Sequence, residues 1–311
     1  MKLFFFISLI FMSFVVQCVA EEMKGEKMSN LETNTILKNW RELWSDGSEL
    51  LLIRLPDYLA EQKLYEVKDK TKESITHKVL SSDSKKAAFT VGTFGSSNPS
   101  DGLYILEFET GDLKKVFDSP EGMINLRGFV GDEQLLLDGY IKIENGVIKY
   151  AEKSADGAHY FYLYNFKNNQ LEDLSDLGVT TVGMANAKCA LNGYSFAYDQ
   201  GDGFVVYNIL EKRNIRINEK GELVGISSNG QKILIHQEEG YSLIKVAEGS
   251  KELVLSTTEI QKVTPIFNGY FELHFQSWSP DGKFVLFGES SDQNEGKGFL
   301  LNLETKELRK I

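Results

Sequence analysis

Near its C-terminus the chain reads Trp278-Ser279-Pro280-Asp281-Gly282-Lys283, and the apolar run 284–287 follows. Asp-Gly beside an apolar run is a strong signal for a tight β-hairpin, because glycine adopts the positive φ that such a turn requires. A second apolar run covers residues 299–303, and a polar turn then leads to the final residues 308–311. The segment therefore predicts a unit of four short antiparallel strands.

The same order of signals occurs six times along the chain. Each unit carries an Asp or Asn at its first turn, and these markers are Asp46, Asp83, Asp132, Asn192, Asn229 and Asp281. A four-stranded unit of this size cannot bury both of its faces alone, whereas units stacked radially cover each other. We therefore predict an all-β fold, a six-bladed β-propeller of four-stranded antiparallel blades, as a single domain over residues 38–311.

The repeat resembles the TolB-type propeller repeat, which is related to WD-type repeats. Residues 278–283 and the shorter Trp44-Ser45-Asp46-Gly47 carry the resemblance, together with the later aliphatic or aromatic strand of each unit. The resemblance implies a propeller over nearly the whole chain and says little about function. TolB itself has an additional α/β domain before its propeller, and residues 21–37 are too few to form one. We therefore do not expect a TolB role.

The repeats also predict where the ring closes. If each unit starts with its inner strand, the first inner strand lies near residues 39–45, the first unit ends at residues 73–76, and the last outer strand is 308–311. The ring then closes between complete blades. The alternative is that residues 31–37 pair into the last blade.

The composition limits the classes of function. The 34 basic and 45 acidic residues give a net charge of −11, which argues against a nucleic-acid partner. Only 2 cysteines are present, so no disulfide framework is expected. Cys189 has Ala185, Ala187, Ala190 and Leu191 around it in the sequence, which favours a buried thiol.

The N-terminal residues predict export. Met1-Lys2 precedes the apolar run 3–16, and a small residue, Ala20, comes before two glutamates. This pattern is typical of a signal peptide over residues 1–20, followed by a polar tether over residues 21–37. We expect a periplasmic or extracellular monomer with no transmembrane span in the mature chain. The alternative is a lipoprotein acylated at Cys18, although Gln17 fits that signal poorly.

Acidic residues concentrate in the long connections of the repeats. In an up-and-down blade the first and third turns lie on one rim, and the second connection and the links between blades lie on the other. The second connections are residues 54–63, 92–102, 138–159, 199–203, 236–240 and 288–297, with 14 acidic and 6 basic residues. This predicts an acidic face that binds a protein or peptide partner, preferably a cationic one. The candidate binding residues are Asp199, Asp202, Glu238, Glu239, Glu289 and Asp292.

No catalytic motif is found, and no cofactor or metal is expected. The sequence has no nucleophile elbow, His-Glu-x-x-His, Cys-x-x-Cys or phosphate-binding loop. Residues 199–203 hold two carboxylates that calcium could use, but they match a plain hairpin turn better. The alternative function is a carbohydrate- or peptide-acting enzyme with a site at the channel mouth, where His159 and His236 are the pair to test. A polyanionic substrate would fit an acidic face poorly.

Overall fold

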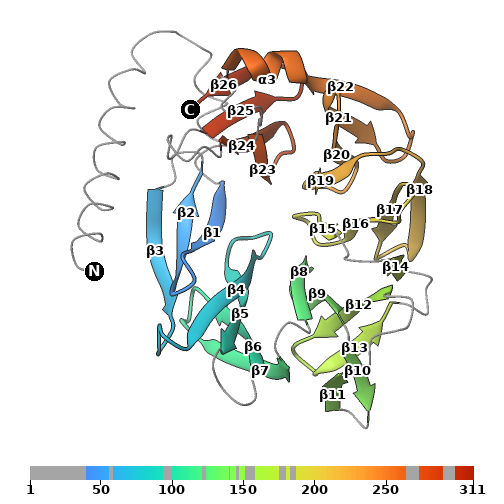
Figure 1. The fold of residues 1–311 in the computed structure, drawn as a ribbon. Helices are drawn as coiled ribbons and strands as arrows, with labels where there is room; N and C mark the ends of the chain where they lie inside the picture. The colour runs from blue at the N-terminus through green and yellow to red at the C-terminus, as the bar shows by residue number, and fades with distance from the viewer. Residues whose placement is uncertain are drawn as a thin grey trace.

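The computed structural model of the 311-residue chain describes residues 40–55, 59–93, 100–120, 124–139, 141–144, 147–150, 158–174, 180–182, 187–263, 273–289 and 298–311. Its strands form antiparallel sheets arranged radially in a ring (Figure 1). This confirms the predicted six-bladed β-propeller of four-stranded antiparallel blades. The predicted signal peptide, tether and lipidated Cys18 lie outside the described residues.

The second to sixth blades each follow the predicted order, with the first strand nearest the axis. The second blade consists of β4 (Glu73–Leu80), β5 (Lys86–Thr93), β6 (Ser100–Glu107) and β7 (Leu113–Pro120), and the third of β8 (Ile124–Val130), β9 (Gln134–Gly139), β12 (Ala158–Asn165) and β13 (Gln170–Asp173). The fourth blade consists of β15 (Ala187–Cys189), β16 (Ser195–Asp199), β17 (Phe204–Asn208) and β18 (Arg213–Ile217), and the fifth of β19 (Glu222–Ile226), β20 (Lys232–Gln237), β21 (Gly240–Lys245) and β22 (Lys251–Ser256). The sixth blade consists of β23 (Leu273–Trp278), β24 (Phe284–Glu289), β25 (Gly298–Asn302) and β26 (Leu308–Lys310).

The links and insertions add a few further elements. In the third blade, β14 (Thr180–Val182) also pairs with β12, and the long connection carries the hairpin of β10 (Ile141–Glu144) and β11 (Val147–Tyr150). After β22, residues Thr257–Val263 form α3, the one helix in the described part of the chain. That helix is short, and Ile260 is its one buried residue.

The Ser-x-Asp/Asn signature fixes the first turn of three blades through the same hydrogen bonds. In the sixth blade, Ser279 Oγ accepts from Phe284 N at 2.9 Å, and Asp281 Oδ1 accepts from Lys283 N at 3.1 Å. The second and fifth blades repeat these bonds with the pairs Ser81/Asp83 and Ser227/Asn229. Side chains that satisfy turn amides in this way explain why the signature recurs.

These first turns, with the third turns beside them, form one edge of the ring, called here the turn rim. The opposite edge of the ring is called the loop rim.

The core lies between the blades. Among the described residues, one apolar cluster fills each junction of neighbouring blades. Between the third and fourth blades, Phe161 lies 5.0 Å from Phe196 and 5.2 Å from Tyr198, measured between ring centroids. Cys189 packs against this cluster, and burial raises the pKa of its thiol to about 12. Each blade thus covers the apolar face of the next one, as a stack of half-buried sheets requires.

The first blade runs in the opposite direction to its neighbours. Its described strands are β1 (Arg41–Ser45), β2 (Glu49–Arg54) and β3 (Leu59–Glu66). The turn after β1 meets the start of β4, because Ile75 N donates to Gly47 O at 2.7 Å. The start of β1 meets the end of β23, because Trp40 Nε1 donates to Ser277 Oγ at 2.9 Å. β1 is therefore antiparallel to β4 and β23, whereas the inner strands of the other five blades share one direction.

This inversion corrects two expectations about the first repeat. The Asp46-Gly47 turn lies at the loop rim and not beside the other first turns, because it contacts the start of β4. Residues 73–76 do not end the first blade; they begin β4, the inner strand of the second blade. A local turn signal is the same whichever way a blade points, so the sequence pattern could not distinguish the two directions.

The ring closes through side-chain packing between the sixth and first blades. Trp40, Ile53 and Leu55 of the first blade pack with Leu286 and Leu300 of the sixth. The outer strand β26 pairs with β25 of its own blade. The alternative closure by residues 31–37 lies outside the described part of the chain.

Candidate binding surfaces

Asp199 lies at the loop rim beside an acidic residue of the next blade. It ends β16 and is partly buried, and burial together with the negative charge of Glu222 raises the pKa of its carboxyl above the usual value. Glu222 begins β19, so the two carboxylates gather where the fourth and fifth blades meet. The sequence analysis missed Glu222 because it begins an inner strand and is not part of a long connection.

Asp202 is not an unpaired anion. Both of its carboxylate oxygens accept from Arg216 Nη2, at 2.7 and 2.9 Å. The pair is solvent-exposed, with 71% of the Asp202 side chain and 54% of the Arg216 side chain accessible. Arg216 lies in β18, the outer strand of the same blade, and its charge offsets that of Asp202.

Glu238 and Glu239 form the tight turn between β20 and β21, and both are exposed. Their backbone carbonyls accept hydrogen bonds from Thr257 Oγ1 and Thr257 N, each at 2.9 Å. The start of α3 therefore holds this turn through its backbone and leaves both carboxylates pointing to solvent.

The remaining predicted binding residues are described only in part. Glu289 ends β24, where its backbone pairs with Leu273, and Asp292 lies outside the described residues. Within the part of the chain that is described, no three His, Cys, Asp or Glu side chains are grouped so that they could hold a metal ion.

The two histidines of the enzyme alternative belong to different blades. His159 lies in β12 of the third blade and pairs with Thr181. His236 lies in β20 of the fifth blade, where its ring centroid is 4.7 Å from that of Tyr241. The whole fourth blade separates the two strands, so the structure does not bring these two positions together.

A buried ion pair removes another acid from the predicted acidic face. Asp138 is fully buried, and its carboxylate accepts from Arg127 Nε at 2.8 Å and from Arg127 Nη2 at 2.9 Å. Arg127 occupies a β-bulge of the inner strand β8, which turns the guanidinium back onto β9. Nearby, burial and the charge of Arg127 lower the pKa of the Lys188 ammonium. The interior at this junction is therefore mixed in charge and not uniformly acidic.

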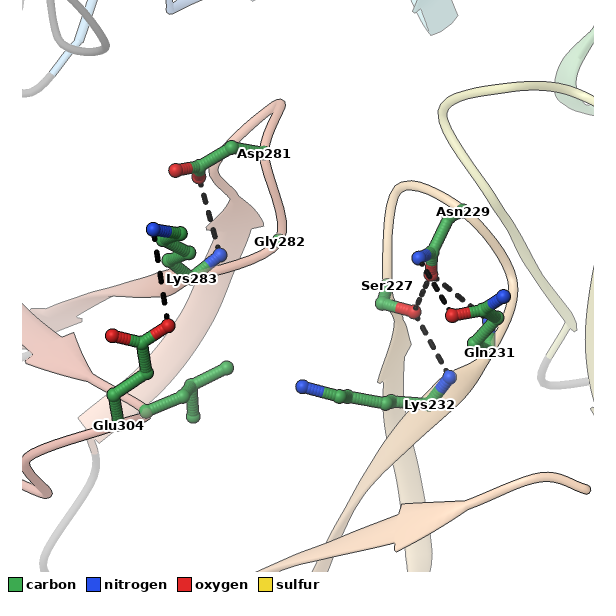
Figure 2. Close-up of a pocket in the computed structure, with 9 residues that line it drawn as sticks. Ser227, Asn229, Gln231, Lys232, Asp281, Gly282, Lys283 and Glu304 are labelled. Atoms are coloured by element: carbon green, nitrogen blue, oxygen red, sulfur yellow. Dashed lines mark hydrogen bonds and ion pairs between the residues drawn. The ribbon is translucent and has the colours of Figure 1, made fainter.

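A cavity of about 260 Å³ opens on the turn rim between the fifth and sixth blades (Figure 2). It is lined by Ser227, Asn229, Gln231, Lys232, Asp281, Gly282, Lys283, Leu303 and Glu304. The sequence analysis did not predict it, because its walls come from first and third turns of two blades.

Comparisons with known proteins support the fold. No family model matches the sequence, and no curated protein matches it. TolB from Acinetobacter baumannii has a similar structure, with a TM-score of 0.58 and 15% identity over 87% of this chain and 62% of that chain. This chain thus spans less than two thirds of that TolB.

Two oligogalacturonate lyases share the architecture. An oligogalacturonate lyase in complex with manganese gives a TM-score of 0.55 and 13% identity over 84% of this chain and 72% of the lyase. The lyase from Vibrio parahaemolyticus gives 0.51 and 14%, over 81% and 71%. The fold is that of the TolB-type propeller, as the resemblance of residues 278–283 implied.

No helix in the described residues is long and apolar enough to span a membrane.

Proposed function

We propose that this protein is an exported, non-catalytic β-propeller that binds a cationic protein or peptide through the acidic loop rim. The observation that carries the proposal is the grouping of carboxylates across one junction, with Asp199 and Glu222 at the contact of two blades. Glu238 and Glu239 add two exposed carboxylates in the fifth blade. Closely spaced carboxylates attract cationic groups.

The contacts refine which of the predicted residues take part. Asp202 is neutralised by Arg216 and Asp138 by Arg127, so neither supplies much attraction. The binding surface proposed here is therefore Asp199, Glu222, Glu238 and Glu239.

The proposed export rests on residues 1–20, whose sequence is typical of a signal peptide. In this proposal the protein acts outside the cytoplasm, either as a free monomer or tethered to a membrane through a lipid on Cys18.

Charge reversal on the loop rim tests this proposal. The variant Asp199→Lys/Glu238→Lys/Glu239→Lys is compared with a matched control, Glu109→Lys/Glu211→Lys/Glu248→Lys, which changes three exposed acids on the turn rim. The probe is fluorescent octalysine at low salt, followed by anisotropy. We expect the first variant to bind at least about tenfold more weakly and the control to change little. Equal weakening by both variants would show that only net charge matters.

A further inference from the structure

The cavity of Figure 2 lies on the turn rim, opposite the acidic surface proposed above. Its two sides are the first turn of the fifth blade and the first and third turns of the sixth (Figure 2). The two turns are joined below it by a buried hydrogen bond from Ser228 Oγ to Ser279 O at 2.7 Å. The cavity is therefore set between two fixed hairpins.

Hydrogen bonds already hold most polar groups of the walls in place. Asn229 Oδ1 lies 2.9 Å from Ser227 Oγ and accepts from Gln231 N at 3.1 Å. Asp281 Oδ1 accepts from Ser279 Oγ at 2.6 Å as well as from Lys283 N. A site whose walls are ordered in advance loses little conformational entropy when a ligand binds.

Lys232 supplies a positive charge that none of these bonds uses, although this charge acts on Glu252 of β22 and helps to lower the pKa of that carboxyl. Its backbone N donates to Ser227 Oγ, while no hydrogen bond or ion pair of its ammonium group is found among the described residues. Figure 2 shows its side chain extending from the turn across the gap, toward the wall that carries Glu304. Lys283 is held loosely, with its Nζ 3.8 Å from Glu304 Oε1.

The second blade provides an internal comparison for Lys232. Lys86 occupies the same place, at the start of the second strand after a Ser-x-Asp turn. Its ammonium donates to Asp132 O at 3.3 Å and lies 5.9 Å from the centroid of the Phe166 ring in the next blade. In the sixth blade Leu303 occupies the position that Phe166 has in the third blade. Each residue directly follows the third strand of its blade, and its backbone N donates to a carbonyl of the first turn. The side chains of Lys86 and Phe166 thus meet at the junction of the second and third blades, whereas the corresponding space beside Lys232, between the fifth and sixth blades, stays open as the cavity.

We propose that this cavity binds a carboxylate of a peptide, with Lys232 and Lys283 as its cationic contacts. Asp281 and Glu304 also line the cavity, but Asp281 is held by its own turn and Glu304 faces Lys283, so the charge of Lys232 favours an anion. The volume accepts one acidic side chain or a C-terminus. The carboxylate forms an ion pair with Lys232 and replaces the long contact of Lys283 with Glu304. This surface is separate from the acidic loop rim and takes a ligand of the opposite charge.

Peptide titrations followed by NMR of the lysine side-chain methylenes test this site. The probes are Ac-Gly-Glu-Gly-Gly-NH2, triglycine with a free C-terminus, and acetate. We expect one of the two peptides to shift the Lys232 and Lys283 signals and to bind more tightly than acetate. Lys232→Met, which keeps the apolar stem, should weaken that peptide at least about tenfold. Lys167→Met, which removes a turn-rim charge in the third blade, is the matched control and should have little effect.

A second variant gives an effect of the opposite sign. Glu304→Gln removes the anion that competes for Lys283, so we expect the peptide to bind about threefold more tightly. The proposal is overturned if neither peptide shifts the Lys232 signals, if acetate binds as tightly as the peptides, or if the two methionine variants lose affinity equally. None of these results depends on octalysine binding at the loop rim.

Discussion

Trp40 Nε1 donates a 2.9 Å hydrogen bond to Ser277 Oγ, a residue 237 positions later in the chain. The bond joins the start of β1 in the first blade to the end of β23 in the sixth. Trp40 is only 2% exposed and packs with Leu286 and Leu300 of the sixth blade. Trp40 therefore takes part in the closure of the ring and shows that the start of β1 lies against the end of β23.

Trp40→Ala is expected to lower the free energy of unfolding by about 3–5 kcal/mol, because it removes a buried indole and leaves a cavity at the closure. Urea unfolding followed by circular dichroism measures the change. Trp44, which is 44% exposed, provides the control, and Trp44→Ala should cost about 1 kcal/mol or less. Similar losses for the two variants would contradict the role given to Trp40.

Glu42 is expected to make stability depend on pH. Burial raises the pKa of its carboxyl from the usual 4.5 to about 7, against the opposing positive charge of Lys78. Because the folded state holds the proton more tightly, the stability from this group is complete below pH 4.5 and falls as the pH rises to about 7.

The substitution Glu42→Gln should remove this dependence. The free energy of unfolding of this variant, compared with that of the unchanged protein, should be about 3 kcal/mol more favourable at pH 8 than at pH 4.5. Urea unfolding of both proteins at the two pH values measures the difference. An effect of Glu42→Gln that is the same at pH 4.5 and pH 8 would show that the carboxyl titrates normally.

Asp138→Ala should destabilise the third blade by about 3–5 kcal/mol, because it leaves the Arg127 guanidinium without its buried carboxylate. The double variant Arg127→Met/Asp138→Leu removes both charges, and we expect it to recover most of the loss. Thermal unfolding of the three proteins separates the outcomes. If Arg127→Met/Asp138→Leu is as unstable as Asp138→Ala, the unpaired charge of Arg127 is not the cause of the loss in stability.

Two glycines with the same backbone conformation should differ sharply in their tolerance of alanine. Gly193 and Gly111 have φ of 74° and 73°. A Cβ at Gly193 would lie 2.3 Å from the carbonyl oxygen of Phe129 in the preceding blade, whereas one at Gly111 would meet no described atom within 4 Å. Gly111→Ala should cost about 1 kcal/mol and Gly193→Ala at least about 3 kcal/mol. Equal melting temperatures for the two variants would contradict this contact between blades.

Much of the fold could be predicted from the sequence. The number of units, the turns at Asp83, Asn229 and Asp281, and the hairpin of residues 141–150 all follow local rules. The candidate site was harder to predict. Asp199 and Glu238 lie at the expected rim, but Asp202 and Asp138 are neutralised by arginines from other strands, and Glu222 was overlooked.

The sequence by itself determined that this protein is a ring of repeated β-sheets, because the turn and strand preferences of each unit act over only a few residues. Tertiary structure alone decided the inverted first blade, the closure through Trp40, the pairing of individual carboxylates and the open cavity beside Lys232. Each of these depends on side chains from different strands or blades meeting in space, and no local pattern records which of them will meet.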